Sequence, residues 1–431
     1  MKYAIASDMH FGYDGCLLVK EDSNGKPVRG DKYDQFIEAV GKDNDYLILV
    51  GDVLDFSVAS YEKAYRNASF FFQTIQQEGI IKRTENGFGP VIYLAGNHDA
   101  DIWYIMQHER SVIKPLTSDP RGFPRDYQHS VAGVLDMRPG TEGFSLWNVT
   151  PKSDSPTPFG GMFLDNITVP KTLFYFAYPN LYIVLDSATS ILVTHGQYLE
   201  MFWSLTGDLA GNVAYDALGF PSADKAHIDL EKMVELNYPL NQLACTGIGQ
   251  AGVLTNIVRD VQKQVYAKDF GTVDTYIDRC GDWLDKEKCK GLLGKLAYDP
   301  LIWIGKNILS HLIKGIEKTR FNADFPKDKE VQQRLRLFYK SSLLEIDRMN
   351  EKRPEAARIP PPRRIIFGHT HDPVAWEDME TLTVPYPEPD STDQLILHNM
   401  GGWLMEGNVF HGGAVFKYDG GRFYSTVVPG S

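Results

Sequence analysis

The sequence predicts an α/β fold, and three observations indicate it. Five short apolar runs are rich in Ile, Val and Tyr, helix-like stretches separate the first three runs, and every run ends in polar residues. Runs of four or five such residues are too short for helices and are typical of buried strands. The composition, 43% hydrophobic and 23% charged over 431 residues, provides ample material for a core.

The five predicted strands share one design. Their polar ends read SDMH, GDVLD, GNHD, HGQ and GHTH. In layered α/β proteins, sites form just beyond the carboxyl ends of such strands, where loops diverge and backbone amides are free. We therefore expect the five polar ends to meet at one sheet edge and to form a site. The strands are YAIA (3–6), YLILV (46–50), VIYLA (91–95), ILVT (191–194) and RIIF (364–367).

The segments between and after these strands differ in character. Helix-like stretches at 33–42 and 61–77 alternate with the first three strands, as in α/β folds. Residues 119–172 are rich in Pro, Gly, Ser and Thr and predict loops or short strands. From 199 to about 350 the apolar spacing is helical. The tail, 393–428, alternates like antiparallel strands with glycine turns.

This order predicts a discontinuous α/β domain, residues 1–195 and 363–431, that carries a mainly helical insertion, residues 196–362. The insertion lies between two of the polar strand ends, so its base should lie at the rim of the site. Two interpretations stay open. The insertion is either a cap that selects the substrate with apolar helices and Lys or Arg side chains, or a set of helices that only pack on one another and on the domain.

Charge and composition exclude some classes. The net charge is −12, and residues 196–362 are neutral, so the acidic excess lies in the predicted α/β domain. This disfavours a general nucleic-acid coat, which needs a basic footprint. No apolar run is long enough for a membrane span, and no secretory signal begins the chain, so we expect a cytoplasmic location. The cysteines Cys16, Cys245, Cys280 and Cys289 are expected to be free thiols, with a Cys280–Cys289 disulfide as the alternative.

The polar strand ends offer a set of metal ligands. Asp8 and His10 are two residues apart, so on an extended backbone both side chains project to one side. A carboxylate such as that of Asp52 can bridge two cations with its two oxygens. Mixed oxygen and nitrogen ligands suit Mn, Fe, Zn or Co rather than Mg or Ca. Each motif alone could be a polar turn, but the five together predict a two-metal centre. The predicted ligands are Asp8, His10, Asp52, Asn97, His195, His369 and His371.

The ordered motifs D-x-H, G-D-x-x-D, G-N-H-D, H-G and G-H-x-H resemble those of the calcineurin-like metallophosphoesterase superfamily. The resemblance implies a two-sheet αββα sandwich, here with the large helical insertion as a cap. It also implies two divalent metal ions, with Mn preferred and Fe, Zn or Co as alternatives. One ion would be held by Asp8, His10 and His371, the other by Asn97, His195 and His369, with Asp52 between them.

The same resemblance implies roles for three further residues. His98 would donate a proton to the leaving oxygen or stabilise the phosphoryl charge, and Asp99 would orient His98. Asp55 would fix a ligand from behind. The implied reaction is hydrolysis, by a metal-bridging water or hydroxide, of a phosphomonoester, phosphodiester or pyrophosphate. The substrate would be a phosphorylated small molecule or a lipid-linked one, with nucleic acid less favoured.

Departures from the family's branches narrow the interpretation. The GDVLDFSV stretch lacks the Arg-Gly with which protein Ser/Thr phosphatases continue, and Asp55 stands where purple acid phosphatases place a tyrosine. Pyrophosphatases that cleave UDP-diacylglucosamine are similar in having a helical insertion, but they usually have Arg where His98 stands. Such a pyrophosphatase, a metal-dependent nuclease and a non-catalytic scaffold stay as alternatives. The acidic charge disfavours the nuclease, and the complete ligand set disfavours the scaffold.

Overall fold

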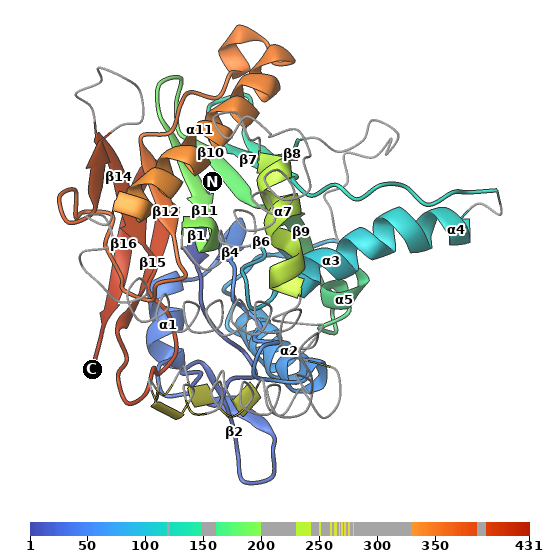
Figure 1. Ribbon diagram of the computed structural model, residues 1–431, viewed down its shortest axis with the longest axis vertical. Coiled ribbons are helices and arrows are strands. Elements are labelled where there is room, and N and C mark those ends of the chain that lie inside the picture. Colours follow the sequence, from blue (N-terminus) through green and yellow to red (C-terminus); the bar gives the residue numbers. More distant parts are fainter. Residues whose placement is uncertain are drawn as a thin grey trace, which may run out of the picture.

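The structure, a computed structural model, describes residues 1–118, 121–147, 161–199, 230–242, 329–385 and 394–431, with isolated positions between 250 and 279 (Figure 1). Two seven-stranded sheets dominate these residues. The first sheet has the order β16-β15-β1-β4-β6-β5, with β9 also pairing with β6, and the second has the order β13-β14-β12-β11-β10-β7-β8. A short hairpin, β2 (Val19–Glu21) and β3 (Pro27–Arg29), stands apart.

The strands of the first sheet are β1 (Tyr3–Ala6), β4 (Tyr46–Val50), β5 (Arg83–Thr84), β6 (Gly87–Leu94), β9 (Thr172–Ala177), β15 (Gly412–Asp419) and β16 (Arg422–Pro429). Those of the second are β7 (Gly133–Asp136), β8 (Gly143–Leu146), β10 (Asn180–Val184), β11 (Ser190–Thr194), β12 (Arg364–Phe367), β13 (Thr383–Pro385) and β14 (Gln394–Asn399). The five apolar runs of the sequence all form strands.

The alternation of side chains along the strands explains how the sheets pack. Ile5, Ile48 and Ile92 point from the first sheet toward Ile183 and Val193 of the second, and all are buried in one cluster. Because successive strand residues face opposite sides, the next residues along each strand face the flanking helices instead. Full burial of each such aliphatic side chain contributes about 1.5–3 kcal/mol. The predicted two-sheet α/β sandwich is confirmed.

Helices cover the outer faces of both sheets (Figure 1). Side chains of α1 (Tyr33–Val40) and α2 (Tyr61–Gln77) share a core cluster with the outer face of the first sheet. The Ser60 hydroxyl caps α2 by accepting a hydrogen bond of 3.2 Å from the Lys63 amide. After β6 come α3 (Ala100–His108), the π-helix η1 (Glu109–Ile113), α4 (Lys114–Ser118) and, later, α5 (Met162–Asp165).

The second sheet is covered by α11 (Lys329–Glu351), which crosses its outer face (Figure 1). Phe338 of α11 stacks on Tyr198, in the short helix η2 (Gln197–Leu199), with ring centroids 6.1 Å apart. Asn180 donates a hydrogen bond of 3.1 Å to the Ser342 hydroxyl. Contacts also join α11 to α7 (Leu230–Gln242), and η7 (Glu355–Ala357) follows α11.

Two expectations from the sequence need correction. The five polar strand ends do not share one sheet edge, because β1, β4 and β6 belong to the first sheet while β11 and β12 belong to the second. The tail is only partly antiparallel. β15 and β16 form the expected hairpin around Gly420 and Gly421, both at positive φ, whereas β14 pairs antiparallel with β13 on one side and parallel with β12 on the other. Alternation along a strand reports which faces are buried, and it carries no information on the direction of the neighbouring strand.

Much of the predicted insertion, 196–362, lies outside the described residues, so the insertion as one helical unit is not confirmed. Its described parts, η2, α7, α11 and η7, are helical. Within the described part of the chain, no helix combines the length and the apolar character needed to cross a membrane. Cys16 is a buried free thiol, and the other three cysteines lie outside the described residues.

Candidate metal centre

The two sheets bring the predicted ligands together from five strand ends. Asp8 and His10 follow β1, Asp52 follows β4, Asn97 follows β6, His195 follows β11, and His369 and His371 follow β12. All seven residues are at most 1% exposed. Parallel pairing of β1 with β4, of β4 with β6, and of β11 with β12 aligns the carboxyl ends within each sheet. Packing of the two sheets then joins the two sets of ends into one buried cluster.

The backbone at this cluster is strained. Of the described non-glycine residues, six have positive φ, and five of these six are predicted ligands. Such values cost free energy for residues with a Cβ and are concentrated at functional sites, where surrounding structure enforces them. The five ligands are Asp8 (55°), His10 (52°), Asp52 (51°), His369 (67°) and His371 (57°).

Glycines precede three of the predicted ligands, Asp52, Asn97 and His369, because the backbone there passes very close to other ligand side chains. A Cβ on Gly51 would collide with the His195 ring, and one on Gly368 would collide with the Asp8 carboxylate. The G-D and G-H pairs of the sequence therefore follow from crowding at the centre as well as from turn geometry.

The predicted ligands fall into two groups. Asp8, His10 and His371 each offer one atom within 4.8 Å of the others, and so do Asp52, His195 and His369. A third group at this spacing joins His10 to Asp55 and His98. The first two groups correspond to the two predicted ions, with Asp52, the predicted bridge, lying in the second. Asn97 joins the second group, because its side-chain oxygen lies 3.1 Å from His195 Nε2. Carboxylate, amide and imidazole donors at this spacing fit divalent transition metals.

The charges at the centre suit cations. Burial alone would raise the pKa of the Asp52 carboxyl, but His195 and His98 outweigh it and hold this pKa well below its ordinary value. The pKa of Asp8 is lowered in the same way, since His195 and His371 together outweigh its burial. Both carboxylates are therefore ionised at neutral pH, which is the form that binds metal.

Partners behind the ligands fix their orientation. His10 Nδ1 lies 2.8 Å from Asp55 Oδ2, and His195 Nδ1 donates a hydrogen bond of 2.9 Å to the Val50 carbonyl. His371 Nδ1 contacts the Glu406 carboxylate, which is 2% exposed. With Nδ1 engaged in this way, Nε2 of each ring is directed at the centre. Asp55 lies where the sequence placed it, as a partner behind a ligand.

His98 lies beside these groups and is 3% exposed. Its Nδ1 is 2.8 Å from the Ser57 hydroxyl and 3.3 Å from Asp55 Oδ1, while its Nε2 is 4.0 Å from Asp52 Oδ2. Ser57 in turn donates a hydrogen bond of 2.6 Å to Asp55. Nε2 is thus the ring nitrogen directed at the metal centre.

The expected contact of Asp99 with His98 is wrong. The Asp99 carboxylate accepts hydrogen bonds from the amides of Gly96 (2.6 Å) and Val53 (2.9 Å) and from the Tyr93 hydroxyl. Burial and the neighbouring Asp52 carboxylate raise the pKa of Asp99 to about 6. Asp99 therefore ties together the loops after β4 and β6, and Ser57 and Asp55 contact His98 in its place.

The sequence did not indicate three residues of the site, Ser57, Tyr93 and Glu406. Ser57 carries a weak signal, since it directly follows the second motif in GDVLDFS. Glu406 carries none, because it contacts His371 across 35 residues of chain and resembles any other acidic residue in the sequence.

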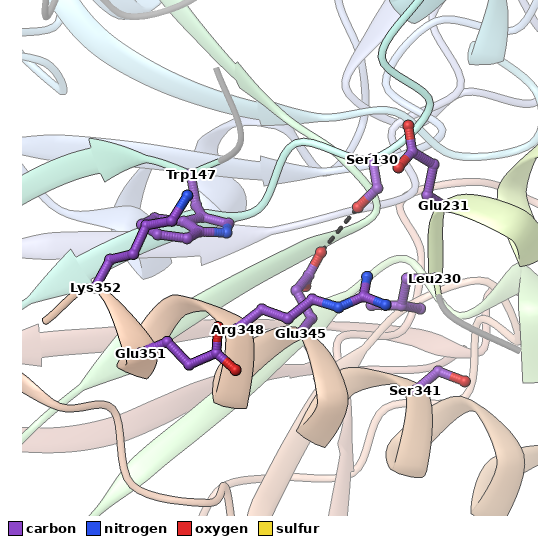
Figure 2. A pocket seen from close by; sticks show the side chains of 9 residues that line it. All are labelled: Ser130, Trp147, Leu230, Glu231, Ser341, Glu345, Arg348, Glu351 and Lys352. Carbon is purple, nitrogen blue, oxygen red and sulfur yellow. Dashed lines mark hydrogen bonds between the residues drawn. The ribbon is translucent and has the colours of Figure 1, made fainter. Parts of the chain in front are cut away.

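A separate polar cavity of about 280 Å³ lies between α11, α7 and the region around β7 and β8 (Figure 2). Its Glu345 carboxylate accepts hydrogen bonds of 2.8 Å from the hydroxyls of Ser130 and Tyr182. Lys352 lies over the Trp147 ring at 5.2 Å, on the opposite side of the cavity from Glu231 (Figure 2). None of the predicted site residues lines this cavity.

Fold and site together define a two-sheet α/β protein with a buried cluster of carboxylate, amide and imidazole side chains suited to divalent metals. A family model described as calcineurin-like phosphoesterase matches residues 1–210. Residues 1–210 therefore match the calcineurin-like phosphoesterase family, in agreement with the superfamily that the motifs predicted. Neither the curated proteins nor the solved structures contain a match.

Proposed function

We propose that the protein is a binuclear-metal-dependent hydrolase of phosphoesters. The observation that carries the proposal is the division of buried ligands into two groups, one around Asp8 and one around Asp52, in a chain whose family acts on phosphoesters. We assign Asp8, His10 and His371 to one ion, Asn97, His195 and His369 to the other, and Asp52 to both.

Two divalent ions, with Mn as our first candidate, would supply Lewis acidity toward the phosphoryl oxygens and lower the pKa of the attacking water. The chain's own residues then do three things. The ligands place the phosphoryl group, burial excludes competing water, and His98 Nε2 faces the position where the leaving oxygen departs. Ser57 and Asp55 hold the His98 ring in that orientation.

We also propose that residues 1–195 and 363–431 form one catalytic domain. Its support is the pairing of distant segments, since β15 pairs with β1 in the first sheet and β12 pairs with β11 in the second. From the sequence we further propose that the segment between these two parts caps the site. We also propose that the protein is cytoplasmic.

The test is a hydrolysis screen in Mn²⁺ over phosphomonoesters, phosphodiesters, nucleotide-sugar lipids and oligonucleotides, with EDTA as the metal-free control. We expect metal-dependent release of product from at least one ester, and at least a thousandfold loss in Asp52→Asn, whose amide cannot bridge two cations as a carboxylate does. Full hydrolysis by Asp52→Asn would sink the proposal. Cleavage of the oligonucleotides alone would make the protein a nuclease.

A further inference from the structure

An apolar groove of about 630 Å³ lies along α3, between α2, η1 and α5. This volume is in the range of pockets that hold small molecules. Met162 and Ile113 line the groove and are 57% and 42% exposed, so large apolar side chains face open space there among the described residues. Figure 1 shows α5 packed beside α3, and contacts between the two helices agree.

The groove lies beside the loops that carry His98. Its first lining residue, Asp101, is three positions after His98 and accepts a hydrogen bond from the Tyr61 hydroxyl. Phe56, whose amide donates to the His98 carbonyl at 3.1 Å, packs edge-on against Tyr61 with centroids 4.7 Å apart. The Asp101 end of the groove therefore lies close to the loops that carry His98, and the groove follows α3 from there.

Aromatic rings form the wall nearest the site. The Phe163 ring lies 6.2 Å from that of Phe56 and 5.2 Å from that of Tyr65. From Asp101 to Ile113 the helical rise of 1.5 Å per residue gives a length on the order of 18 Å. A groove of this length suits an extended chain better than a compact ring.

The charges at the groove select against an anion. Among the described residues that line it, His108 is the one basic residue, none is Lys or Arg, and two, Asp101 and Glu109, are acidic. Glu109 is held by the Met162 amide at 2.7 Å and by Lys114 at 3.0 Å. A phosphate, a nucleic acid or an anionic membrane surface would meet these carboxylates, whereas an uncharged hydrocarbon chain buries the apolar wall at no electrostatic cost.

We propose that this groove binds the apolar portion of the leaving group, so that the substrate is a phosphoester of a long-chain alcohol. The proposal rests on the hydrolytic function proposed above. Water adds to phosphorus, the P–O bond to the alcohol breaks, and the departing oxygen takes a proton from His98 as the alcohol stays in the groove. The phosphate end remains with the metal ligands.

The test measures binding, so that it does not depend on turnover. Ethylphosphonate and dodecylphosphonate, the latter below its critical micelle concentration, are titrated into the Mn²⁺-loaded chain by calorimetry. We expect dodecylphosphonate to bind at least tenfold more tightly, since each methylene buried contributes up to about fourfold. Met162→Glu and Ile113→Glu should each remove most of that advantage while leaving ethylphosphonate unchanged.

Val427→Glu is the matched control, because Val427 is 40% exposed on β16 and does not line the groove. It should keep the full advantage of the long chain. Equal binding of the two phosphonates, or equal effects of all three variants, would overturn the proposal. So would a change of oligomeric state in Met162→Glu without any effect on chain-length preference, which would make the groove an interface between copies. If the long chain binds tightly but no ester is hydrolysed, the groove stands and the hydrolytic function fails.

Discussion

Two enclosed carboxylates of this chain, Asp52 at the metal centre and Glu345 in the polar cavity beneath α11, have pKa values shifted in opposite directions. Burial opposes ionisation of both. At Asp52 the surrounding histidines reverse that effect and lower the pKa, whereas at Glu345 the partners are the neutral hydroxyls of Tyr182 and Ser130, and burial raises the pKa to about 7. Burial alone therefore does not mark a metal site. What distinguishes the centre is the set of imidazoles around its carboxylates.

Among substitutions that leave the predicted ligands intact, the largest loss of turnover is expected from His98→Ala, beside Asp52. Loss of the ring should reduce turnover by about 10²–10⁴-fold, the usual contribution of a positioned proton donor. Metal content should be unchanged, because the described contacts place His98 beside the ligands and directed at Asp52. Kinetics with metal analysis of the same preparation tests this, and loss of metal would mean that His98 is a ligand.

A smaller effect is expected from Glu406→Gln. Glu406 contacts His371 Nδ1, and removing such a carboxylate partner usually weakens metal affinity 10–100-fold. Titration of Mn²⁺ into the metal-free chain measures the change. Glu345→Gln is the matched control, since it makes the same substitution in the polar cavity and should leave Mn²⁺ affinity unaltered. Equal losses in both variants would remove the special role of Glu406.

The smallest effect on activity is expected from Glu345→Gln, which should keep full turnover and change only the pH dependence of stability. The pKa of Glu345 is raised from 4.5 to about 7, so its contribution to stability is fully present below about pH 4.5 and is lost as the pH rises through 7. Between pH 5 and 8 the wild type should lose up to about 3 kcal/mol relative to the variant. Urea unfolding at both pH values measures this, and a pH-independent difference would show that Glu345 titrates normally.

The sequence predicted the strands, and the candidate ligands that the structure brings together, because both have local signals. β1, β4 and β12 begin and end where their apolar runs do, and each is followed by a motif that combines glycine with donors. Only the resemblance to the family predicted which ligand would bind which ion. Extended geometry alone allowed His369 and His371 to bind the same ion, whereas in the structure they fall into different groups.

What the sequence missed depends on contacts across long stretches of chain. The parallel pairing of β14 with β12, the contact of Glu406 with His371 and the capture of Asp99 by Tyr93 each require the assembled sheets. The Asp99 error has a simple cause. Adjacency in sequence suggested a contact with His98, but the Asp99 side chain instead accepts hydrogen bonds from the backbone amides of Gly96 and Val53.

The central claim is that the seven buried ligands hold two divalent ions in one catalytic centre. The number of Mn²⁺ ions bound per chain, measured by elemental analysis after equilibrium dialysis, tests it most directly. We expect two ions per wild-type chain. Saturation at one ion, or at none, would contradict it.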